Sequence, residues 1–128
     1  MKKLGVYIHI PFCIKKCFYC DFYSEPIGDP QFHRKYVKAL IKEIIFYGEN
    51  MGKEYQIDTI FIGGGTPSIL EPIFIREILS ALKKYFYVEK NAEITIECNP
   101  ATLSEEKLQA YREEGINRIS ICLLYTSP

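Results

Sequence analysis

Three cysteines stand close together near the N-terminus: Cys13, Cys17 and Cys20, with the spacing C-x-x-x-C-x-x-C. On a loop, thiolates at this spacing can converge on one iron–sulfur cluster. Three ligands would leave one iron of a four-iron cluster open to a small molecule that binds through its amine and carboxylate. The spacing therefore favours a cluster with an open position. The alternatives are a zinc site completed by His9 or Cys98, and cysteines that only pack.

A run of glycines forms a second unusual segment: Gly63, Gly64 and Gly65, followed by Thr66. Successive glycines let the backbone approach a ligand closely, and they expose N–H and C=O groups that side chains would obstruct. A tight turn between a strand and a helix is the alternative explanation. The segment is not a P-loop, because no Gly-Lys-Ser/Thr sequence follows it.

Polar side chains also lie at the ends of two expected strands. Alternation puts Tyr7 and His9 on one face of the first strand, and Thr95 and Glu97 on one face of a later strand. The Glu97 carboxylate could accept hydrogen bonds from a ligand, or it could be a solvated strand end. Cys98 points opposite to Glu97, so we expect a packed thiol and not a fourth ligand.

Alternating strands and helices have to position these groups. Short apolar runs rich in β-forming residues predict the strands, and apolar residues at helical spacing predict the helices between them. Ser104 is expected to cap the third helix and Gly115 to end it. We expect strands over 4–10, 57–62, 93–97 and 117–121, and helices from Asp29-Pro30 to near Gly48, over 72–86, and from Ser104 to Gly115.

This alternation predicts an α/β fold with a parallel sheet built from right-handed βαβ units. Periodicity alone leaves open whether the sheet is doubly wound or part of a barrel. In both architectures the active face lies at the carboxyl ends of the strands. The cysteine segment, the glycine segment and Glu97 all fall at that edge, which predicts one shared site.

Size and charge exclude several classes of protein. The chain has 128 residues, enough for one domain at most. Lys and Arg together number 16, as do Asp and Glu, so the net charge of zero gives no indication of nucleic-acid binding. No apolar stretch approaches the roughly 20 residues of a transmembrane segment, and we expect a cytoplasmic protein. Thiols stay reduced there, so the odd number of cysteines favours metal ligation over disulfides.

The motifs resemble one known family. The segment from Tyr7 to Cys13, the cysteine triplet and the segment from Gly63 to Ser68 are similar to the radical S-adenosylmethionine (SAM) family of oxygen-independent coproporphyrinogen III oxidases and their heme-chaperone relatives. The resemblance implies the N-terminal part of a partial (β/α) barrel over residues 1–121. It also implies a 4Fe–4S cluster whose open iron binds SAM. A reducing electron donor would drive SAM cleavage to a 5′-deoxyadenosyl radical that abstracts hydrogen.

The same resemblance assigns roles to individual residues. Gly63–Gly65 and Thr66 would bind the methionine end of SAM, and Glu97 would accept hydrogen bonds from its ammonium or ribose. Tyr19 would pack beside the adenine, although an aromatic residue there could simply cover the cluster. Tyr7 would lie near the cofactor or a porphyrin, although it could instead be a satisfied interior group.

Two departures from the family pattern point to the heme-chaperone branch. Phe22 stands where the oxidases carry a further cysteine, and the chain begins directly with its first strand. Heme or a porphyrinogen is then the expected partner. A true coproporphyrinogen III decarboxylase is the first alternative, and a zinc-stabilised α/β binding module is the second. Residues 122–128 depart from the family's Gly-x-Gln-Ser segment, and we expect this length of chain to be inactive on its own.

Overall fold

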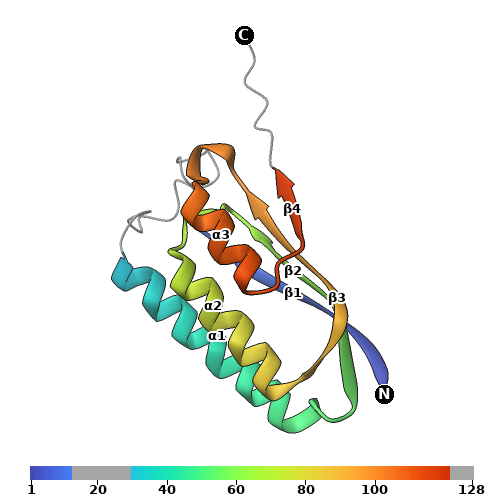
Figure 1. Cartoon of the computed structure of the whole chain (residues 1–128). Coiled ribbons are helices and arrows are strands. Elements are labelled where there is room, and N and C mark those ends of the chain that lie inside the picture. Colours follow the sequence, from blue (N-terminus) through green and yellow to red (C-terminus); the bar gives the residue numbers. More distant parts are fainter. Residues whose placement is uncertain (13–29, 122–128) are drawn as a thin grey trace.

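The computed structural model describes residues 1–12 and 30–121 (Figure 1). Strands and helices alternate as the sequence predicts, with a short 3-10 turn after each of the two middle strands. The strands are β1 (Lys2–Ile10), β2 (Tyr55–Gly64), β3 (Tyr87–Cys98) and β4 (Arg118–Ile121); the helices are α1 (Pro30–Met51), α2 (Pro72–Tyr85) and α3 (Glu105–Glu113); the 3-10 turns are η2 (Pro67–Ile69) and η3 (Pro100–Thr102).

The four strands form one parallel sheet in the order β1-β2-β3-β4. Each strand therefore lies beside the strand that precedes it in the chain, and Figure 1 shows the three helices together on one side of the sheet. A doubly wound sheet would reverse its strand order and carry helices on both faces. The sequential order resolves the choice that periodicity left open, in favour of barrel-type winding.

The core lies between the sheet and the helices. Alternate strand residues point into it, because side chains alternate across a strand. The matching stripe on α2 closes the core from the other side. The strand residues of this layer are Ile8, Ile10, Ile60, Ile62, Ile94 and Ile96, and the α2 residues are Ile75, Ile78, Leu79 and Leu82, all of them buried.

We expected helix α1 to end near Gly48, but it continues to Met51. Gly48 is buried where α1 crosses α2, and a Cβ atom at this position would lie 2.5 Å from the Cβ of Tyr85. The glycine therefore serves a close helix contact rather than a helix end. Sequence alone cannot separate these two uses, because the partner helix is far along the chain.

Three strands are longer than predicted, since β1 begins at Lys2, β2 spans Tyr55–Gly64 and β3 spans Tyr87–Cys98. Strand β2 continues through Gly63 and Gly64, which pair with His9 and Ile10 of β1. Strand β3 begins at Tyr87, ahead of a polar stretch that hides the apolar pattern in the sequence. The glycine segment is therefore partly strand and only partly turn.

Both predicted ends of α3 are confirmed. The Ser104 hydroxyl accepts a hydrogen bond from the Lys107 backbone N–H at 3.1 Å, as an N-cap does. Gly115 has a φ of +94°, the backbone conformation that favours glycine after a helix.

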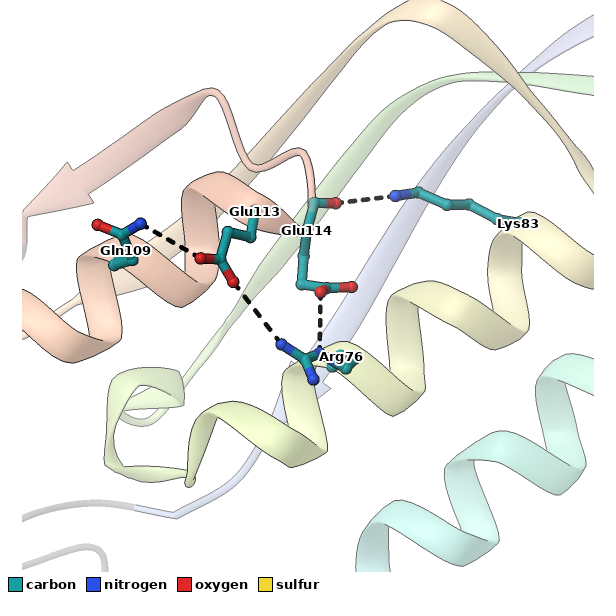
Figure 2. A network of polar contacts seen from close by, with 5 residues as sticks. All are labelled: Arg76, Lys83, Gln109, Glu113 and Glu114. Atoms are coloured by element: carbon teal, nitrogen blue, oxygen red, sulfur yellow. Dashed lines mark hydrogen bonds and ion pairs between the residues drawn. The ribbon is translucent and has the colours of Figure 1, made fainter.

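Polar contacts join the end of α3 to α2 (Figure 2). The Arg76 Nε lies 2.9 Å from the Glu114 Oε2, and the Lys83 ammonium donates to the Glu114 carbonyl at 2.8 Å. Glu113 lies between Arg76 and Gln109. A cation at the last carbonyls of a helix also suits the helix dipole.

Helix α1 has 22 residues but is not apolar enough to cross a membrane. None of the other helices in the described part of the chain is long and apolar enough to cross a bilayer either.

Candidate functional site

The carboxyl ends of β1, β2 and β3 meet at one edge of the sheet, as predicted. His9 pairs with Gly63, and Tyr7, Phe61 and Thr95 are neighbours across the three strands. The register therefore places Tyr7, His9 and Glu97 on the face opposite the helices. The predicted alternation of these side chains is confirmed.

The glycine turn is tied to the end of β1 by backbone hydrogen bonds. The Gly65 N–H donates to the Ile10 carbonyl at 2.8 Å, and the Thr66 N–H donates to the Phe12 carbonyl at 2.5 Å. Gly64 has a φ of +119°, and a Cβ there would lie 2.6 Å from the Ile10 carbonyl oxygen. A glycine is required at this position both by the backbone conformation and by the contact with β1.

Glu97 reaches across to the same turn. Its Oε1 accepts a hydrogen bond from the Gly64 N–H at 3.0 Å. A Cβ at Gly63 would lie 2.7 Å from this oxygen, so the absence of a side chain at position 63 makes room for the carboxylate. Sequence reasoning placed Gly64 and Glu97 at the same edge but did not find the hydrogen bond between them.

Aromatic residues surround the end of β1. The Tyr7 hydroxyl and the His9 Nδ1 are 3.0 Å apart, and the Tyr7 ring stacks on Phe61 with ring centroids 6.0 Å apart. Tyr7 is 57% exposed, so it is not an interior group. The Tyr36 hydroxyl, from α1, donates to the His9 carbonyl. Burial, and then the nearby Glu43 carboxylate, raises the pKa of Tyr36, which keeps its phenol protonated as a donor.

Phe12 anchors the point at which the cysteine segment begins. Its buried ring packs against Phe32, His33 and Tyr36 of α1, with centroid distances of 5.7, 4.4 and 5.5 Å. Sequence analysis missed this role, although Phe12 immediately precedes Cys13 and lies within the motif that carries the family resemblance. The ring contacts and the hydrogen bond from Thr66 together hold Phe12 beside the glycine turn.

The predicted cluster ligands Cys13, Cys17 and Cys20, together with Tyr19, lie outside the described residues. Residues 1–12 and 30–121 contain no group of three His, Cys, Asp or Glu side chains that could hold a metal ion. The ligand assignment therefore remains a prediction from the sequence.

Cys98 is a packed thiol, as predicted. It is 1% exposed, lies on the helix-covered face of β3, and donates to the Ile96 carbonyl at 3.8 Å. Burial raises the pKa of Cys98 from its ordinary value of 9.0 to about 11, while a hydrogen bond with Ser68 acts in the opposite direction. Cys98 therefore lies on the opposite face of β3 from Glu97.

We expect iodoacetamide to label Cys98 at pH 8 at least about a hundredfold more slowly in the folded chain than in the urea-unfolded chain. A rise of two pKa units lowers the thiolate fraction by about this factor, and burial adds to it. Peptide mass spectrometry would give the rate for each cysteine. Equal rates in the two states would contradict the burial.

Since the folded pKa is raised, the stability that the thiol contributes is complete below pH 9 and is lost as the pH rises through about 11.

Comparisons with known proteins agree with this geometry. The family model of the radical SAM superfamily matches residues 7–127. The heme chaperone HemW of Buchnera aphidicola subsp. Schizaphis graminum is 44% identical over 118 residues, which are 92% of this chain and 31% of that protein. The oxygen-independent coproporphyrinogen III oxidase of Bradyrhizobium diazoefficiens is 34% identical over 117 residues, covering 91% of this chain and 26% of that protein.

A solved structure shows the same fold. The coproporphyrinogen III oxidase HemN from Escherichia coli, a radical SAM enzyme, matches with a TM-score of 0.82 at 31% identity and covers 94% of this chain. The chain spans between 26% and 31% of the length of these relatives. Because the family model covers nearly the whole sequence and the solved structure has the same winding, this chain belongs to the radical SAM superfamily.

Proposed function

We propose that this chain forms the cofactor-binding part of a radical SAM protein of heme metabolism, most closely a heme chaperone. The observation that carries the proposal is the hydrogen bond between the Gly64 amide and the Glu97 carboxylate. It lies at the edge of the sheet where β1 ends, and the Thr66 N–H donates to the carbonyl of Phe12, the residue before Cys13. The ends of β1, β2 and β3 therefore support one shared site, which the cysteines that follow β1 would complete.

The described residues fit the amino end of SAM. None of the hydrogen bonds among the described residues uses the second carboxylate oxygen of Glu97, so that oxygen is available to a ligand ammonium or hydroxyl. The glycine turn presents backbone groups without side chains in front of them. Gly63–Gly65 and Thr66 would hold the methionine end, and Glu97 would orient it.

Cys13, Cys17 and Cys20 would hold the 4Fe–4S cluster beside that ligand, and Tyr19 would pack beside the adenine of SAM. When bound, the cluster and SAM supply one-electron chemistry, with the electron coming from an external donor. Phe12 would keep the first cysteine next to the glycine turn, and the exposed ring of Tyr7 would offer a flat surface to the cofactor or to a porphyrin. A reducing compartment, which we propose is the cytoplasm, preserves these thiols.

The chaperone and the oxidase differ in their product. Phe22, which stands in place of a fourth cysteine, supports the chaperone, whereas the similarity to the HemN structure keeps porphyrinogen decarboxylation as the second candidate. Heme titration beside a decarboxylation assay, both on the longest natural chain that contains this sequence, would separate them. A chaperone binds heme and releases no carbon dioxide. Turnover of coproporphyrinogen III by the 128 residues alone would contradict our expectation that this length is inactive.

Metal analysis tests the proposed cluster directly. After anaerobic reconstitution with iron, sulfide and zinc, we expect the 128-residue chain to hold iron and acid-labile sulfide in equal amounts, with an absorbance band that bleaches on reduction. Thiolate ligands beside an open iron favour this outcome over a closed zinc site. Zinc without sulfide would support the binding module instead and would overturn the proposal.

A further inference from the structure

The two loops that follow β2 and β3 contact each other directly behind the site. Ser68, in η2, is fully buried, and its hydroxyl accepts a hydrogen bond from the Asn99 N–H at 3.1 Å. The same hydroxyl is hydrogen-bonded to the Thr102 side chain, in η3. Thr102 in turn donates to the Asn99 carbonyl at 2.8 Å. The two loops are therefore one hydrogen-bonded unit.

Lys107 binds both loops at once. From the first turn of α3, its ammonium donates to the Ser68 carbonyl at 2.6 Å and to the Thr102 carbonyl at 2.9 Å. The Ser104 cap fixes the backbone from which this side chain extends. None of the ion pairs among the described residues involves Lys107. A cation held by two carbonyl groups sets the distance between two backbone segments rather than neutralising an acid.

Placing the cation here has an energetic cost. Burial lowers the pKa of Lys107, although electrostatic interactions with Cys98 and Glu71 oppose this shift. A partly desolvated ammonium is retained where its hydrogen bonds serve a purpose that an apolar side chain could not. Here the two hydrogen bonds hold the loops after β2 and β3 at a fixed separation.

These loops continue directly from the groups that define the site. Ser68 follows the glycine turn, and Asn99 is two residues beyond Glu97. We infer that Lys107 is a positioning residue for SAM: it holds the loops after β2 and β3 at the separation at which the Gly64 amide orients the Glu97 carboxylate toward the ligand. This inference rests on the proposed function of the same edge.

The fold does not depend on Lys107 alone. Tyr111 of α3 is buried in the core, and Arg76 binds Glu114 at the far end of the helix. Removing the ammonium should therefore leave α3 in place and release the two loops. The consequence would be weaker ligand binding in a chain that is still folded.

The test compares SAM binding in lysine variants of the cluster-loaded chain by isothermal titration calorimetry under anaerobic conditions. Lys107→Met keeps the aliphatic stem, and we expect it to raise the Kd for SAM about tenfold or more at unchanged iron and sulfide content. Lys107→Arg retains a donor pair and should recover most of the affinity. Lys83→Met is the matched control, since Lys83 also donates to a backbone carbonyl but at the opposite end of α3, and it should bind SAM as the wild type does.

Two results would overturn the inference and leave the proposed function standing: wild-type affinity in Lys107→Met, or an equal loss in Lys83→Met. Failure of the wild-type, cluster-loaded chain to bind SAM would remove the proposed function and the inference together. If Lys107→Met does not fold, Lys107→Gln, which keeps one polar donor group, replaces it, and its Kd for SAM is compared with that of Lys83→Met in the same way.

Discussion

Replacing Cys17 with alanine is expected to abolish cluster uptake and, with it, reductive cleavage of SAM. The proposed site has only three protein ligands, so loss of one leaves two thiolates for four irons. Two thiolates do not hold such a cluster with an open position for a ligand. Iron and sulfide content of the 128-residue chain gives the first measurement. Formation of 5′-deoxyadenosine by the longest natural chain, with dithionite as reductant, gives the second.

Cys98→Ala is the matched control for Cys17→Ala. It makes the same chemical change at a thiol that is buried on the helix-covered face of β3. We expect full cluster content and a loss in the free energy of unfolding of about 1 kcal/mol from the small cavity. Cluster loss in Cys98→Ala, or retained SAM cleavage in Cys17→Ala, would show that the ligands are assigned wrongly.

Replacing Gly64 with alanine is expected to lower the free energy of unfolding by about 2–5 kcal/mol and to eliminate measurable SAM binding. Two costs add together. The backbone conformation at φ +119° strains any residue with a side chain, and the new methyl group would lie 2.6 Å from the Ile10 carbonyl oxygen. Relief of this clash would move the turn away from β1 and break the hydrogen bond to Glu97. Urea unfolding and SAM titration would measure the two effects.

Gly115→Ala separates these two costs. Gly115 also has a positive φ, but its nearest neighbours would be 3.5 Å or more from an added Cβ. Alanine there bears the conformational strain alone, about 1–2 kcal/mol, without moving the cofactor edge. Similar losses of stability in the two variants would mean that the contact between Gly64 and β1 contributes little.

Local chemistry in the sequence predicted much of the fold. Ser104 and Gly115 mark the ends of α3 because capping and positive φ depend on single residues. The alternation of Tyr7 with Ile8, and of Glu97 with Cys98, predicted which side chains face the site, because the strand repeat is fixed by the backbone. Cys98 was accordingly recognised as a packed thiol.

The features that sequence reasoning missed all depend on contacts between distant segments. Glycine is a residue type that is common at helix ends, but Gly48 is required by its close contact with Tyr85 on another helix. Lys107 has the pattern of a solvated helix residue, and only the folded chain brings the Ser68 and Thr102 carbonyls to it. The hydrogen bond between Gly64 and Glu97 likewise requires the pairing of β2 with β3. The cluster ligands themselves remain a prediction from cysteine spacing.

The sequential strand order also bears on how the chain folds. Every strand pairs with its predecessor, yet the separations differ: Lys2 pairs with Tyr55, whereas Thr95 pairs with Arg118, a separation less than half as large. Closing the longer loop costs about 0.7 kcal/mol more in chain entropy. Pairing of β1 with β2 therefore has the highest cost in chain entropy. Its contacts join residues that are farther apart in the sequence than those of the other strand pairs. The contact between the end of β1 and the glycine turn should therefore form late, after β2, β3 and β4 have assembled.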